Sequence, residues 1–155
     1  MKIRPNTLWR VPVFCSLFSV ICFYITLYLG GFFFTVQTPG SDGTIALSID
    51  PLRSAIFNGG LFLLVLLIGG LWEFRSMTKA EIAISASILV AFHLTVTIAQ
   101  LLSDFPVGIG IALAYIQTWQ GNVSSFLLKL TNNFEFSVTA SCFAPFLFVP
   151  FGKKA

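Results

Sequence analysis

Four polar residues recur at helical spacing within an apolar stretch and are the strongest candidates for chemistry in this sequence. They are His93, Thr97, Gln100 and Asp104, at offsets of 0, 4, 7 and 11 residues. This spacing places them on one face of an α-helix. Ionisable groups at membrane depth usually face a bundle interior or a water-filled cavity, because burying them in lipid is costly. The sequence therefore predicts a polar binding track along this helix, from one membrane surface towards the midplane.

Two interpretations of this track fit the residue types. It could carry a proton, an ion or a small ligand, because histidine is the side chain that titrates near neutral pH. Alternatively, His93, Thr97 and Gln100 form hydrogen bonds between helices, which such side chains commonly do in membranes. The second interpretation is the stronger one, since a lone histidine without a carboxylate inside the membrane is weak support for transport.

A second group with potential chemistry consists of carboxylates that are expected on the same side of the membrane. They are Asp42, Asp50, Asp104 and Glu135. If they converged, they could bind a cation or form an acid–base pair for a membrane enzyme. Asp50 and Asp104 also stand where helix N-caps are expected, and loops exposed to water account for the others. We therefore predict no catalytic residue and no metal site.

Other signatures of chemistry do not occur in the sequence. Cys15, Cys22 and Cys142 lie in apolar segments without a CxxC pair, so we expect free thiols packed as small apolar side chains. No HExxH, GxSxG, P-loop or GxGxxG motif occurs. No cluster of lysine and arginine forms a stripe for nucleic acid. The sequence predicts neither a cofactor nor a nucleic-acid partner.

The composition indicates that a membrane surrounds these residues. Hydrophobic types make up 56% of the 155 residues and charged types 10%. A soluble domain carries roughly a quarter charged residues, so there are too few ionised groups here to cover a surface that faces water. We expect residues 1–155 to form a single integral membrane domain. Helices should build it, because each spanning segment must satisfy its own backbone hydrogen bonds.

Long apolar runs predict an all-α transmembrane helical bundle with four spans. At about 1.5 Å per residue, each run crosses most or all of about 30 Å of hydrocarbon. Turn-forming Pro-Gly and Asp-Gly pairs follow the first run, and residues 44–49 could form a short extended piece before the second. The four spans are expected at about residues 11–36, 54–72, 82–102 and 136–151.

Residues 107–128 form the ambiguous segment. Its apolar part, Val107–Trp119, is only about 13 residues long, a length typical of re-entrant or interfacial helices. We therefore expect a short helix of this kind before the last span. The alternative is a fifth span, with Gln117, Gln120 and Asn122 facing other helices.

Basic residues favour four spans and predict the orientation. With four spans, seven lysine and arginine residues fall on the side of both termini, while Arg53 and Lys129 fall on the other. With five spans the count becomes six against three. The positive-inside rule then places both termini in the cytoplasm, and we expect a bacterial inner membrane. The seven residues are Lys2, Arg4, Arg10, Arg75, Lys79, Lys153 and Lys154.

The expected function follows from these features. A non-enzymatic accessory, assembly or protective protein that acts through helix–helix contacts fits best, because the polar groups are of the kind that packs helices together. Its partners would be the lipid bilayer and another membrane protein or a second copy. A small transporter or channel component that uses the polar face of the third span is the alternative. A membrane enzyme with outer carboxylates is the second alternative.

Overall fold

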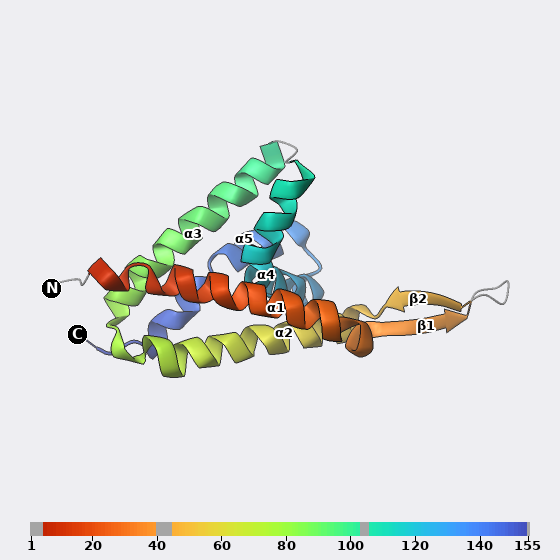
Figure 1. Ribbon diagram of the computed structural model, residues 1–155, viewed down its shortest axis with the longest axis horizontal. Helices are drawn as coiled ribbons and strands as arrows, with labels where there is room; N and C mark the ends of the chain where they lie inside the picture. Colours follow the sequence, from red (N-terminus) through yellow and green to blue (C-terminus); the bar gives the residue numbers. More distant parts are fainter. Residues whose placement is uncertain (1–4, 40–44, 103–105, 155) are drawn as a thin grey trace.

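The chain folds into long helices and one two-stranded hairpin, as a computed structural model of residues 5–39, 45–102 and 106–154 describes (Figure 1). The expectation of a mostly helical protein is confirmed in the described residues. The elements, in chain order, are η1 (Pro5–Thr7), α1 (Arg10–Phe34), β1 (Thr35–Pro39), β2 (Ile45–Ile49), α2 (Pro51–Ile68), η2 (Gly69–Glu73), η3 (Phe74–Ser76), α3 (Lys79–Leu102), α4 (Val107–Thr131), α5 (Phe134–Cys142) and η4 (Ala144–Phe151).

Helices α1 and α2 form a long antiparallel pair that the hairpin joins at one end (Figure 1). Strand β1 pairs with β2 in antiparallel register, from Thr35 opposite Ile49 to Pro39 opposite Ile45. The extended piece expected at residues 44–49 is thus seen as Ile45–Ile49. We call this end of the molecule, from Thr35 to Asp50, the hairpin end.

Asp50 fixes the start of α2. Its carboxylate accepts hydrogen bonds from the backbone N–H groups of Leu52 and Arg53, at 2.9 and 3.1 Å. Pro51 occupies the first turn of α2. The backbone N–H groups of a first turn have no acceptor inside the helix, so the N–H that proline lacks is not missed there. The N-cap expected at Asp50 is therefore confirmed. Asp104, the other expected N-cap, lies outside the described residues.

Three described helical segments are long and apolar enough to cross a membrane. They are Arg10–Phe34, Pro51–Ser76 and Lys79–Gln100. A fourth crossing would be broken, because α5 and η4 meet at an angle of 43°. The span expected at residues 136–151, which two prolines were expected to interrupt, thus consists of two short helices and counts as a crossing only if the bent pair is one span. Pro145 and Pro150 give the physical reason, since proline lacks the N–H that an α-helix needs.

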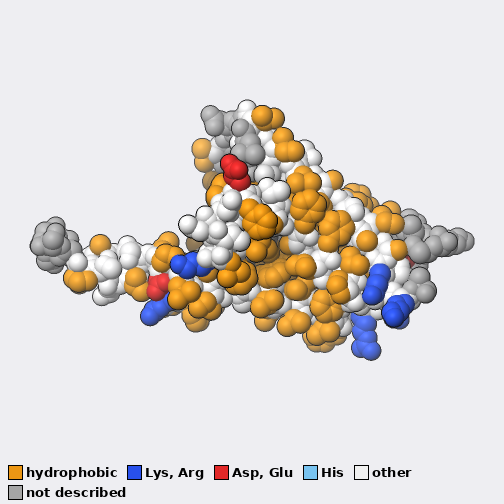
Figure 2. Space-filling model, turned by 180° about the vertical axis from the view of Figure 1, so that it is seen from behind, with side chains coloured by type: hydrophobic (Ala, Val, Ile, Leu, Met, Phe, Trp, Pro, Cys, Tyr) orange, Lys and Arg blue, Asp and Glu red, His pale blue; other side chains and the backbone are white. Residues whose placement is uncertain are grey.

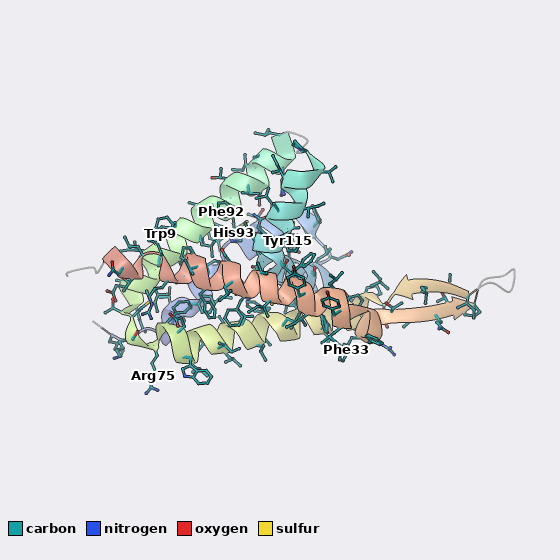
Figure 3. The ribbon with its side chains drawn as sticks, in the orientation of Figure 1. Trp9, Phe33, Arg75, Phe92, His93 and Tyr115 are labelled. Carbon is teal, nitrogen blue, oxygen red and sulfur yellow. The ribbon has the colours of Figure 1, made fainter. Side chains whose placement is uncertain are left out.

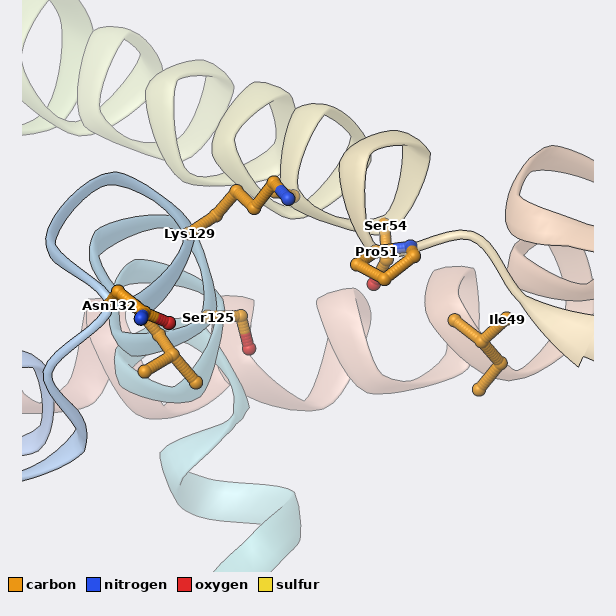
Figure 4. A pocket seen from close by; sticks show the side chains of 8 residues that line it. Ile49, Pro51, Ser54, Ser125, Lys129 and Asn132 are labelled. Carbon is orange, nitrogen blue, oxygen red and sulfur yellow. The ribbon is translucent and has the colours of Figure 1, made fainter.

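Helix α4 differs from the short helix expected in residues 107–128. It is 25 residues long and ends where Asn132 adopts a left-handed conformation, with φ at 51°. It is not among the three segments apolar enough to span. It lies centrally instead, packed against α1, α2 and α5. Its two halves run in different directions, since Figure 4 shows the first half (cyan) from the side and the second half (blue) nearly end-on.

The start of α1, the turn between α2 and α3 and the segment after η4 meet at one end (Figure 1). Arg10 pairs with Glu73 at 3.0 Å and donates a hydrogen bond to Ser76 Oγ at 3.1 Å. The backbone N–H of Lys153 donates to the carbonyl of Met77 at 2.9 Å, and that of Lys79 donates to the carbonyl of Lys153 at 3.1 Å. We call this the termini end. Its three segments share one end, as the four-span topology expects.

Aromatic side chains fill the core between α1, α4, η4 and the end of α2. The Phe14 and Phe74 ring centroids are 5.1 Å apart, those of Phe74 and Phe148 are 4.9 Å apart, and Trp119 stacks on Phe148 at 5.5 Å. Outside this core, Figure 2 shows apolar side chains over the middle of the molecule and lysine and arginine side chains towards its two ends. That distribution suits a protein embedded in lipid.

A substitution at Gly152 tests the close packing of backbone at the termini end. A Cβ added there would lie 2.8 Å from the backbone nitrogen of Lys79, and backbone cannot move aside cheaply. We expect Gly152→Ala to lower the free energy of unfolding by about 1–3 kcal/mol, the usual cost of overpacking. The measurement is unfolding in mixed detergent micelles followed by circular dichroism. Gly60→Ala is the control, because a Cβ at Gly60 would meet nothing within 4 Å. Equal effects of the two variants would contradict the close approach.

Candidate functional site

Buried and partly buried polar side chains of α3, α4 and α5 form a hydrogen-bonded cluster around His93, which Figure 3 labels. We call it the His93 cluster. His93 is 2% exposed and Gln120 7%, while the two members from the end of α5 are completely buried. The cluster consists of His93 and Thr97 of α3, Gln120 of α4, and Ser141 and Cys142 of α5.

Gln120 connects the three helices of this cluster. Its side-chain oxygen accepts a hydrogen bond from His93 Nδ1. Its side-chain nitrogen donates to Ser141 Oγ at 3.3 Å and to Cys142 Sγ at 3.2 Å. A carbonyl oxygen only accepts, so Nδ1 of His93 carries a hydrogen. The amide of Gln120 thus uses both its donor and its acceptor inside the protein.

The other members complete the network. Thr97 Oγ1 lies 3.7 Å from Cys142 Sγ, and Ser141 Oγ donates to the carbonyl of Val138 at 2.7 Å. Thr97 and His93, the first two residues of the track predicted on α3, therefore share the face that packs on α4 and α5. Neither Gln120 nor Ser141 was predicted in this cluster, because their contacts depend on how the helices cross.

Gln100, the third residue of the predicted track, lies elsewhere. It is exposed and lines an open cavity of about 390 Å³ between α3 and α4, which we call the α4 groove. Asp104, the fourth residue, lies outside the described residues. The binding role of the track stays a prediction. The α4 groove is lined by Gln100, Gly110, Ala114, Gln117, Thr118, Gly121, Asn122 and Ser125.

Two amides of the α4 groove have side-chain nitrogens that lack a hydrogen-bond partner within the described chain. The side-chain nitrogens of Gln117 and Asn122 are buried and unpaired, and Asn122 is only 4% exposed. A buried donor without a partner costs several kcal/mol in an apolar environment. This cost makes the groove a site that another molecule would stabilise.

Space for such a molecule exists beside the two amides. A Cβ added at Gly110 or at Gly121 would meet nothing within 4 Å. Both glycines therefore leave bare backbone on the side of α4 that lines the groove. The sequence does contain a signal for this, because Gly110, Ala114, Gln117 and Gly121 follow one another at offsets of 4, 3 and 4 residues. That spacing places them on one helix face.

The remaining candidate groups have other roles. All three cysteines are free and buried, as expected. Among the carboxylates, Asp50 caps α2 and pairs with Arg53 at 3.5 Å. Glu135 lies in the first turn of α5, whereas Asp42 falls outside the described residues. In the part of the chain that the structure describes, no three side chains of the metal-binding types come together.

Comparisons of this chain with protein-family models, with curated proteins and with solved structures give no match. The function must therefore be argued from the side chains themselves.

The hydrogen bond between His93 and Gln120 can be measured by a double-mutant cycle. We expect His93→Leu, Gln120→Leu and the double variant to give a coupling of about 0.6–1.7 kcal/mol in the free energy of unfolding, the range found for hydrogen bonds between membrane helices. The measurement is unfolding in mixed micelles.

Thr95→Val is the control for this cycle. Its hydroxyl donates only to the carbonyl of Ala91 on its own helix, at 2.8 Å, so combining it with Gln120→Leu should give additive effects. Additivity in the cycle of His93 and Gln120 itself would show that the two side chains do not stabilise each other.

Proposed function

We propose that this chain is a small non-enzymatic membrane protein that binds a transmembrane helix of another protein, as an accessory, assembly or protective protein. The α4 groove carries the proposal. It combines two buried amide nitrogens that have no partner in the described chain with two glycines at which an added Cβ would meet nothing within 4 Å. Small residues let two membrane helices approach closely, and amides hold such helices together.

The lining of the groove favours a particular partner. None of the described residues that line it is acidic or basic, and the nitrogens of Gln117 and Asn122 need acceptors. An uncharged acceptor such as a serine, threonine, asparagine or glutamine side chain supplies what they lack. We therefore propose a partner helix that presents small residues and one such polar side chain towards Gly110 and Gly121.

The His93 cluster supports this function over transport. The hydrogen bonds of Gln120 are made within the protein, so the cluster acts as packing that holds the second half of α4 against α3 and α5. No carboxylate takes part in it among the described residues. A rigid α4 in turn presents the groove in a fixed shape.

We also propose a topology of four crossings. The bent pair of α5 and η4 would be the fourth, and α4 would enter the membrane and return without crossing it. Two contacts support this path. Trp119, midway along α4, donates a backbone hydrogen bond to Ser19 in the middle of α1, at 3.2 Å. Lys129, near the end of α4, lines a cavity with Pro51 at the start of α2. The termini end would face the cytoplasm of a bacterium, because it carries five of the seven basic residues that the structure describes.

A large side chain placed in the α4 groove should prevent binding of the partner helix. We expect the tagged wild-type chain, extracted from its native membrane in mild detergent, to retain a specific membrane protein. Gly121→Leu should reduce that retention at least tenfold, because the leucine side chain occupies the space in which the partner helix lies. The measurement is the quantity of partner that elutes per mole of tagged chain.

Gly31→Leu is the matched control for this experiment. Gly31 is an exposed glycine of α1 with nothing within 4 Å of an added Cβ, and it lies away from the groove. It should retain the partner fully. A strictly monomeric wild-type chain without any partner, or full retention by Gly121→Leu, would contradict the proposed function.

A further inference from the structure

A second cavity lies at the hairpin end, between the start of α2 and the end of α4 (Figure 4). Its volume is about 590 Å³, which is large enough for part of a lipid molecule. The residues that line it are Ile49, Pro51, Ser54, Ala55, Ser125, Leu128, Lys129 and Asn132. Because Ser125 also lines the α4 groove, the two cavities are neighbours on α4.

The lining of this cavity is half apolar and half polar. Ile49, Ala55 and Leu128 offer hydrocarbon, whereas Ser54 and Lys129 offer hydrogen-bond donors. The Ser54 hydroxyl oxygen accepts from the side-chain nitrogen of Asn58 at 3.4 Å, so its own hydrogen is free to donate outwards. Such a lining suits a ligand that is itself amphipathic.

Lys129 is the cation of the cavity. It is exposed, and no ion pair joins it to a carboxylate of the described residues. In Figure 4 its side chain extends from α4 towards α2 and does not point away from the molecule. Its position in the last turn of α4 is favourable for the helix dipole, which explains a basic residue there. The dipole does not explain why the side chain crosses a cavity that also holds free hydroxyl groups.

The cavity lies at the level at which α2 begins and α4 ends. Asp50 and Pro51 mark the point at which α2 begins, and Asn132 ends α4. A spanning helix begins near the lipid headgroups, so with α2 as a span we place the ammonium group of Lys129 at the level of the lipid phosphates, and Ala55 one turn further along α2.

We propose that this cavity binds the headgroup of an anionic phospholipid. The phosphate accepts hydrogen bonds from the ammonium group of Lys129 and from the hydroxyls of Ser54 and Ser125, while the glycerol and upper acyl chain lie against Ile49 and Leu128. Charge-assisted hydrogen bonds of this kind are stronger than neutral ones. This site shares Ser125 with the α4 groove but does not rest on the partner helix proposed there.

The test uses the purified full-length chain in mild detergent and native mass spectrometry of bound lipid. Phosphatidylglycerol is titrated against phosphatidylcholine with the same acyl chains. We expect phosphatidylglycerol to bind more tightly, and Lys129→Gln to weaken its binding about fivefold, the contribution of one basic side chain near an anionic lipid surface. Lys129→Arg should keep most of the affinity, because it keeps the charge.

Arg53→Gln is the matched control, since Arg53 is a basic residue at the same end that does not line the cavity. It should leave the affinity for phosphatidylglycerol unchanged. An equal loss in Arg53→Gln and Lys129→Gln would overturn the proposal in favour of a diffuse attraction of charges. Equal binding of the two lipids would overturn it as well. Displacement of the lipid by inorganic phosphate at equal concentration would assign the cavity to a soluble anion instead.

Discussion

Hydrocarbon provides no hydrogen-bond partners, and the arrangement of α3, α4 and α5 depends on how Gln120 meets that constraint. Its amide binds His93 on one side and the end of α5 on the other, so one side chain satisfies polar groups from three helices. Replacing Gln120 with an apolar residue would leave several buried polar groups without hydrogen-bond partners. The free-energy cost of each such group exceeds the net stabilisation that one hydrogen bond contributes. The aromatic core around Trp119 then packs on a helix whose position is already fixed.

The same constraint is met unevenly along α4. Gln120 is fully paired, whereas Gln117 and Asn122, three residues before it and two after it, keep unpaired nitrogens beside bare glycine. Proteins rarely bury polar groups without partners, and those that are buried in this way require an explanation. The paired and unpaired amides therefore divide α4 into a face that holds the protein together and a face that is available to another molecule.

The sequence predicted the spans better than their contacts. Apolar runs and the placement of basic residues located α1, α2 and α3, and the chemistry of Asp50 located a helix start. Helical spacing correctly put His93 and Thr97 on one face, but it could not show that Gln100 meets a cavity while those two meet helices. Spacing describes one helix at a time, and what lies opposite depends on how two helices cross.

The length of α4 also depends on tertiary contacts that a sequence does not show. Polar residues after Trp119 suggested that the apolar helix stops there, because amides in lipid are unfavourable. In the structure Gln120 faces protein, so the helix continues to Thr131 and stops only where Asn132 turns into a left-handed conformation. A sequence reports polarity, whereas the direction in which a polar side chain points is a property of the folded state.

The pairing of Lys153 with Met77 and Lys79 has a consequence for biogenesis. The ribosome makes this strand-like segment after every helix that it closes on. Helices α1 to α4 are therefore synthesised before the termini end can close, and the positions beside Gly69 and Gly70 are filled only once Phe148 and Phe151 have been made. Closure of the termini end is thus the last packing step that these helices can complete.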